Sequence, residues 1–213
     1  MKRQYPKSCT AFASYRLIAT GPPAQVALRA KALIESGDPA PVLIFDDLTG
    51  EPVELDLRGT AQNVLAQFQM PLGEEWPKGG LPQTPAEVPA GPGRPKLGVI
   101  GREVTLLPRH WDWLGTQPGG ASVTLRKVVE AAMRSSAGSD RARLAQEAIY
   151  RFMNAMTGNL PGFEEATRIL FSKKRDRLPE FEKTVCAWPA DIRRHITRLL
   201  TELIELEMMA VEV

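Results

Sequence analysis

Cysteine and histidine are scarce in this chain of 213 residues, which holds two of each. Cys9 and Cys186 lie far apart, so they form neither a disulfide framework nor the paired spacing of a zinc site. His110 and His195 lie in different segments, and neither belongs to a motif that gathers a nucleophile, a base and a carboxylate. We therefore predict no catalytic residue, no metal site and no cofactor, and a protein that is not an enzyme.

Long apolar runs are also missing. The start of the chain, Met1-Lys2-Arg3, is not followed by the apolar stretch that a signal peptide or a transmembrane helix requires. No glycine-rich nucleotide-binding motif occurs either. The sequence predicts a cytoplasmic protein without a membrane contact, and in that compartment both thiols stay reduced.

The chain has no overall excess of one charge, because 27 Lys and Arg nearly balance 25 Asp and Glu. The balance differs along the chain. Residues 91–143 hold nine basic and four acidic side chains, a net charge of +5, while the rest is near neutral. A local basic excess is the electrostatic signature of phosphate binding, and it is also compatible with an ordinary solvated surface. Apolar residues make up 43% of the chain, enough for a globular core.

Residues 1–70 have the pattern of a small α+β unit, resembling a small α/β sandwich. Two strand-like runs flank a bend within residues 9–21, and a helix is predicted over residues 22–37. An apolar run, a turn and an alternating run predict a hairpin over residues 41–59. Thr60 is the expected cap of a helix over residues 60–69.

The remaining organisation is a linker, a middle segment and a helical tail. Residues 71–96 hold seven prolines and five glycines without periodicity, which predicts a linker. Residues 97–137 form the middle segment, followed by a short break at "SSAGSD". Residues 138–213 carry apolar stripes at helical spacing, which predict a helical bundle. We therefore expect an α+β fold with four parts.

The middle segment predicts a strand, a helix, a glycine turn and a second helix. Over residues 102–106 apolar Val104 and Leu106 alternate with polar Glu103 and Thr105. A proline then starts a helix with an apolar stripe, "PGG" ends it, and a serine caps the next helix, which has a second stripe. All four elements fit within about thirty-five residues.

This order resembles the ribbon–helix–helix repressors, obligate dimers whose paired strands enter the major groove of DNA. The resemblance implies base-facing positions at Glu103 and Thr105, with Arg102 at the strand edge. It also implies phosphate contacts at the start of the second helix. Upstream, "GRPK" resembles the core of an AT-hook, whose basic side chains lie in narrow minor grooves. The candidate DNA-binding residues are Arg94, Lys96, Arg102, Glu103, Thr105, Ser122, Thr124 and Arg126.

Most of the chain resembles a bacterial family known as domain of unknown function 2239. The segments that carry this resemblance are "TAFASYRLIATGP", "VLIFDDLTGEPVELDLRG", "GRPKLGVIGREVTLLPRHWDWLGTQPGGASVTLRKVVEAA", "EAIYRFMNAMTGNLPGFEEATR" and "WPADIRRHI". The family implies no activity, substrate or site residue. It implies that the N-terminal unit, the middle segment and the tail belong together in one recurring protein.

Two functions follow from this sequence as hypotheses. The first is a homodimeric DNA-binding regulator that uses the middle segment. The second is a non-catalytic interaction or scaffolding protein, in which that segment packs within its own chain and the helical tail binds a protein partner. DNA binding would become less probable if the strand at residues 104–106 paired inside its own chain with Glu103 and Thr105 buried.

Overall fold

The computed structural model of the chain describes residues 5–68, 100, 102–172, 174 and 176–211. Contacts between residues divide the chain into two units. Residues 1–73 and 135–213 form the first, here called the sheet–helix unit, and residues 74–134 form the second, here called the middle unit. The predicted linker at residues 71–96 lies outside the described residues.

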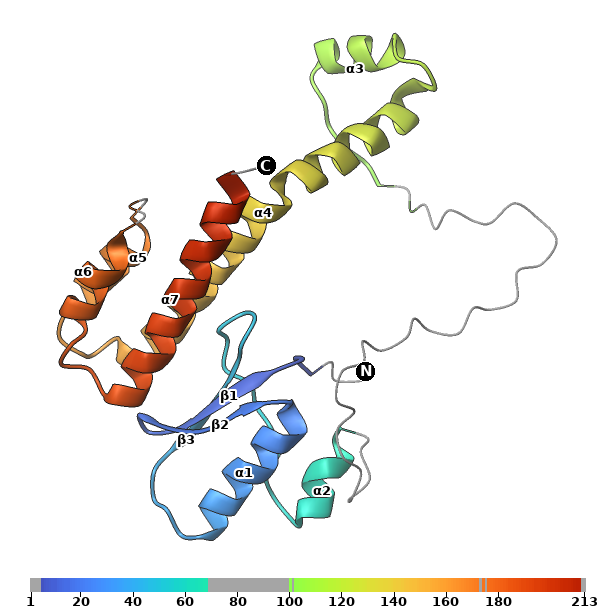
Figure 1. Ribbon diagram of the computed structural model, residues 1–213. Helices are drawn as coiled ribbons and strands as arrows, with labels where there is room; N and C mark the ends of the chain where they lie inside the picture. The colour runs from blue at the N-terminus through green and yellow to red at the C-terminus, as the bar shows by residue number, and fades with distance from the viewer. Residues whose placement is uncertain (1–4, 69–99, 101, 173, 175, 212–213) are drawn as a thin grey trace. The chain divides into compact units, whose positions relative to one another are not determined.

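A three-stranded antiparallel sheet begins the sheet–helix unit (Figure 1). Its strands are β1 (Cys9–Ala13), β2 (Arg16–Gly21) and β3 (Val42–Asp46), in the order β2-β1-β3. Every residue of β1 is buried, because this central strand is covered on both faces. The predicted bend between the first two strands is confirmed, and Ser14 makes it with a positive φ of 49°.

Helix α1 (Pro23–Glu35) covers one face of the sheet. Its first residue is a proline, which suits a position whose N–H has no partner in a helix. Gly37, just beyond its end, has a φ of 82°, a conformation that favours glycine. Val26 and Ala30 are buried against the sheet, so the predicted helix and its inner face are confirmed.

The predicted hairpin after β3 forms only in part. After the turn, an isolated bridge joins Phe45 and Pro52, and no regular second strand follows. Proline lacks the N–H that a continuing ladder needs. The expected alternation of buried and exposed side chains is nevertheless present. The apolar residues at 53, 55 and 57 are partly buried, and their neighbours at 54, 56 and 58 are exposed.

Helix α2 (Ala61–Ala66) follows, and its predicted cap is confirmed. The Thr60 hydroxyl accepts a hydrogen bond from the backbone N–H of Asn63, and the Asn63 side chain accepts one from the backbone N–H of Thr60. This reciprocal pair satisfies two donors at the helix start. The predicted end of the helix at Gln69 lies outside the described residues.

The other face of the sheet packs against the helical tail, which forms the main core. Phe12 and Phe45 join a cluster that includes Phe152, Phe181 and Ile196. The cluster is built by the second half of α4 (Gly120–Thr157), by α5 (Phe163–Leu170) and α6 (Arg177–Thr184), and by α7 (Ala190–Val211). The predicted apolar stripes of the tail therefore do form a core.

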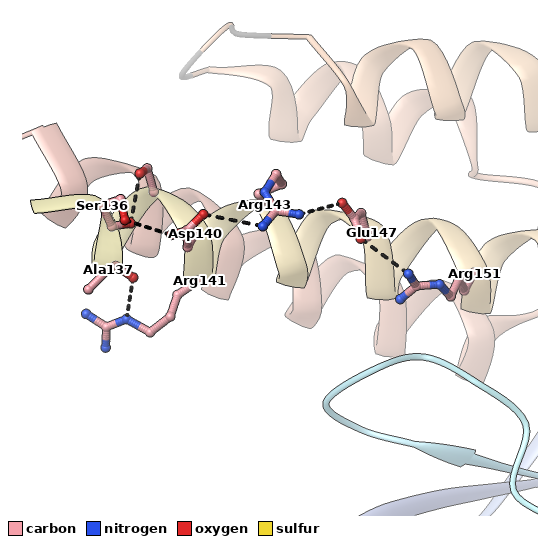
Figure 2. Close-up of polar contacts among 8 residues, drawn as sticks. Ser136, Ala137, Asp140, Arg141, Arg143, Glu147 and Arg151 are labelled. Carbon is pink, nitrogen blue, oxygen red and sulfur yellow. Dashed lines mark hydrogen bonds and ion pairs between the residues drawn. The ribbon is translucent and has the colours of Figure 1, made fainter. Parts of the chain in front are cut away.

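Helix α4 passes through the break that the sequence predicts at "SSAGSD", so that prediction is wrong. Figure 2 shows the side chains that support the helix there. Ser136 donates a hydrogen bond to the carboxylate of Asp140, and Arg143 contacts both Asp140 and Glu147. Gly138 packs against Ala210 of α7, an approach that a larger side chain would hinder. The predicted boundary between residues 137 and 138 falls inside this helix.

The predicted strand at residues 102–106 is also absent, since these residues have no regular structure. A strand needs a hydrogen-bonded neighbour, and no other described part of this chain pairs with them. The two helices after this segment are confirmed: α3 (Pro108–Gly115) and the first part of α4.

Candidate functional site

The middle unit is built around a turn between two helices. Helix α3 ends near Thr116, whose hydroxyl donates a hydrogen bond to the carbonyl oxygen of Trp113. Gly119 and Gly120 then adopt φ values of 89° and 73°, so both occupy the left-handed region. Residues with a Cβ rarely adopt that conformation, and "PGG" is therefore a structural requirement of the turn. Helix α4 begins at the second of these glycines.

The predicted DNA-binding residues of the middle unit fall into two groups by exposure. Arg102, Glu103, Thr105, Ser122 and Arg126 are exposed. None of these side chains forms a hydrogen bond or ion pair with another described residue, so they stay available to a partner.

Thr124 differs, because it is buried in the single chain, contrary to the exposed position that a DNA-contacting residue needs. Arg94 and Lys96 lie outside the described residues.

Apolar side chains of the middle unit are mostly exposed, contrary to the core role that their spacing predicts. Among its described residues, Leu114 is the one apolar side chain that is fully buried. Two helices joined by a short turn cannot be held together by so small an interior. The large apolar side chains left exposed are Ile100, Val104, Leu107, Trp111, Trp113, Val128, Val129 and Met133. We call this set the apolar face of the middle unit.

A second group of polar residues lies in the sheet–helix unit, where β1, β3 and α7 meet. Asp47 accepts hydrogen bonds from the hydroxyls of Ser8 and Thr10, the latter at 2.6 Å, and Thr10 in turn contacts Thr20 at 3.2 Å. Both carboxylate oxygens are therefore engaged. Local sequence patterns did not point to this cluster, because the hydroxyl partners of Asp47 are more than 35 residues away in the chain.

His195 on α7 lies close to Asp47 but is packed among aromatic rings. Its ring centroid is 4.7 Å from that of Phe152 and 5.4 Å from that of Phe12. Burial, followed by the nearby charge of Arg198, lowers the pKa of His195 from its ordinary 6.5 to about 4, and Asp47 opposes part of this shift. The imidazole is therefore neutral at pH 7. Local sequence patterns did not reveal this aromatic packing, because both rings come from segments distant in the chain.

These residues do not form the arrangement that nucleophilic catalysis needs. The Ser8 hydroxyl donates to Asp47 rather than to His195, and no described hydroxyl or thiol is hydrogen-bonded to the imidazole. Burial, followed by the charges of Asp47 and Asp46, raises the pKa of the Cys9 thiol to about 12, which keeps it protonated and unreactive. Cys186, by contrast, is exposed.

Metal and membrane sites are not found in the described part of the chain. No group of three His, Cys, Asp or Glu side chains there is arranged to hold a metal ion. Among the described helices, none has both the length and the apolar composition to cross a bilayer.

Comparison with known proteins identifies the family. The model of a family described as an uncharacterized protein conserved in bacteria (DUF2239) matches residues 8–200. The chain belongs to this family. The match covers the sheet, the middle unit and most of the helical tail, so these parts of the DUF2239 protein recur together. Searches of curated proteins and of solved structures found no significant match.

Proposed function

We propose that this DUF2239 protein is a homodimeric DNA-binding regulator, and that its middle unit is the DNA-binding module. The observation that supports the proposal is the exposed apolar face of the middle unit. It lies in the same unit as residues 102–106, whose backbone makes no hydrogen bond to the described part of the chain. An exposed apolar surface of this kind on a helix pair marks an interaction site.

A second copy of the chain is the partner that satisfies both features at once. Residues 102–106 make no backbone hydrogen bond to the described part of their own chain. Paired with the same segment of another copy, they would form a two-stranded antiparallel ribbon, and the apolar faces of the two helix pairs would cover one another. This is the arrangement of the ribbon–helix–helix dimers that the sequence resembles.

The charge of the segment suits a phosphate backbone. Between residues 102 and 134 the described side chains include five basic and three acidic groups, so the net charge is +2 per chain and doubles in a dimer. Arg102 and Arg126 are exposed and unpaired among the described residues. Backbone N–H groups in the first turn of α4, beside exposed Ser122, would add donors for a phosphate oxygen.

In such a ribbon, Glu103 and Thr105 are the side chains that would face the bases. They alternate with Val104 and Leu106, which turn toward the helices of the dimer. A glutamate can accept a hydrogen bond from the N4 amino group of cytosine, and a threonine can contact several bases. Specific binding would therefore favour sites with cytosine at the position opposite Glu103.

Binding of the full chain to random duplex DNA across a salt series tests the proposal. The logarithm of affinity should fall linearly with the logarithm of salt concentration. Arg102→Ala and Arg126→Ala should each weaken binding and reduce the slope by about 1, because each removes a phosphate contact. Arg168→Ala, which removes an exposed arginine of α5 outside the middle unit, is the matched control and should leave the slope unchanged.

Absence of binding at low salt, where electrostatic attraction is strongest, would end the DNA hypothesis. The interaction-protein alternative would then be preferred, with the helical tail as the surface to examine for a protein partner.

A further inference from the structure

A pocket of about 270 Å³ lies in the sheet–helix unit between the turn after β3, α4 and α7. At ~30 Å³ for each water-sized group, it has room for roughly nine such groups. Its walls are mostly apolar and include Phe45, Ala145, Ile149, Leu199 and Leu203. Apolar walls of this kind favour the hydrocarbon part of a ligand over water.

The turn that forms one wall of the pocket is held tightly. Gly50 has a φ of 68°, and a Cβ there would come within 2.0 Å of the carbonyl oxygen of Ala148 on α4. The Arg151 guanidinium donates to the carbonyl oxygen of Thr49 at 2.9 Å, which fixes the turn to the same helix. Leu48 in this turn is nonetheless exposed, as is Leu144 on α4. These two leucines extend the apolar wall to the open edge of the pocket.

The two ends of the pocket carry different charges. Helices α4 and α7 run in opposite directions, since Gly138 contacts Ala210 while Phe152 contacts His195. Arg141 is therefore at the end of the pocket farther from His195, about 16 Å along α4 from Phe152 at 1.5 Å per residue. Asp46 and Asp47 lie at the His195 end.

Arg141 is the charged basic side chain that lines the pocket, and it is exposed with hydrogen-bonding capacity to spare. Figure 2 shows its Nε donating to the carbonyl oxygen of Ala137, and its two terminal nitrogens make no other bond to described residues. Each acidic side chain of the lining already has at least one partner in the chain. Asp47 accepts from two hydroxyls and Asp46 from the N–H of Leu48, while Glu202 pairs with Arg198 at 2.6 Å.

We propose that this pocket binds a medium-chain alkyl carboxylate, with the carboxylate on Arg141 and the chain between α4 and α7. An arginine fork can hold a carboxylate through two parallel hydrogen bonds. The methyl end of the chain points toward Phe45 and Phe152. The site is separate from the middle unit, and the proposal does not depend on DNA binding.

Calorimetric titration of the full chain with octanoate, 1-octanol and octylamine tests this site. These probes share a chain length and differ in the charge of the head group. Octanoate should bind in a saturable way and more tightly than either of the others. Arg141→Gln should weaken the binding of octanoate by about tenfold, to the affinity of 1-octanol, and should leave the affinity for 1-octanol unchanged.

Two further variants complete the test. Arg143→Gln is the matched control, because this arginine is two residues along α4, on a different side of the helix, and belongs to the Asp140–Glu147 ladder. It should leave octanoate binding unchanged. Ala145→Leu should weaken both octanoate and octanol by filling the pocket, with circular dichroism confirming that the variant is folded.

Three results would overturn the proposal. The first is no saturable binding of octanoate by the folded protein. The second is octylamine binding as tightly as octanoate, which would assign the site to Asp46 and Asp47. The third is octanoate binding that Arg141→Gln does not weaken.

Discussion

His195 is a histidine whose surroundings suppress its charge. It lies against the rings of Phe12 and Phe152, and its pKa is lowered to about 4, first by burial and then by Arg198. Removing an imidazolium from water costs free energy, and Asp47, which is engaged with hydroxyls, offsets only part of that cost. The protonation state of this one side chain is thus set by residues from β1 and α4.

The stability of the protein should consequently depend on the protonation of His195. Its pKa in the folded state, about 4, is below its ordinary 6.5, so the unfolded chain binds the extra proton between these values. The contribution of neutral His195 to the free energy of unfolding is complete above about pH 6.5. It decreases as the pH falls toward 4, and the total loss is about 3 kcal/mol. Urea unfolding from pH 7 to pH 4 measures it.

Two variants separate this histidine from the carboxylates that titrate in the same range. His195→Phe keeps an aromatic ring in the core and should show a smaller loss of stability on acidification. His110→Gln changes an exposed histidine and should follow the native protein. Equal pH dependence in the native protein and in His195→Phe would mean that His195 does not control it.

At the scale of elements, an ion pair joins the start of α6 to the end of α7. Arg177 is 1% exposed and donates to both carboxylate oxygens of Glu207, at 2.9 and 3.0 Å. It also donates to the backbone carbonyl of Lys174. A buried guanidinium needs an anion nearby, so this contact restricts where the short helix α6 can lie on α7.

Removal of the acidic partner should therefore lower the free energy of unfolding much more in this buried pair than in an exposed pair. We expect Glu207→Gln to destabilise the protein by about 3 kcal/mol, because it leaves a buried cation without its partner. Glu202→Gln on the same helix removes a pair whose side chains are 50% and 53% exposed, and should change stability by less than about 1 kcal/mol. Chemical denaturation of the two variants measures both values, and similar losses would contradict this ranking.

At the scale of the whole molecule, the protein should be a dimer that the apolar face of the middle unit holds together. Val129 on α4 is 52% exposed in the single chain, and Ile34 on α1 is 48% exposed. Val129→Glu should raise the dimer dissociation constant by about a hundredfold, since it places a charge in an apolar interface. Ile34→Glu changes an equally exposed residue of the other unit and should leave the dimer intact.

Sedimentation equilibrium of the full chain over a range of concentrations measures this dissociation. A native protein that stays monomeric throughout would exclude the dimer, and with it the ribbon. If Val129→Glu does not weaken the dimer, the dimer interface does not include this part of α4. A dimer lost in that variant, together with DNA binding, would connect the two properties.

Local patterns in the sequence were sufficient for much of this molecule. The strand pair around Ser14, the limits of α1 and the cap at Thr60 follow from contacts between residues close in the chain. The apolar stripes of the tail also predict its helices, because a 3.6-residue period is itself a local property. The family resemblance rests on the same chain segments, and the match over residues 8–200 confirms it.

Tertiary contacts decided the rest, because they join residues that no local pattern relates. The pairing of Arg177 with Glu207, the aromatic surroundings of His195 and the pocket beside Arg141 each involve distant segments. The same reason explains two wrong predictions. A strand at residues 102–106 has no neighbour to pair with in its own chain, and the serine-rich stretch of α4 stays helical through its own side-chain bonds and its packing on α7. The sequence alone determined most of the helices and which of their faces are apolar, because these depend on residues close in the chain, and only the folded chain decided what each of those faces meets.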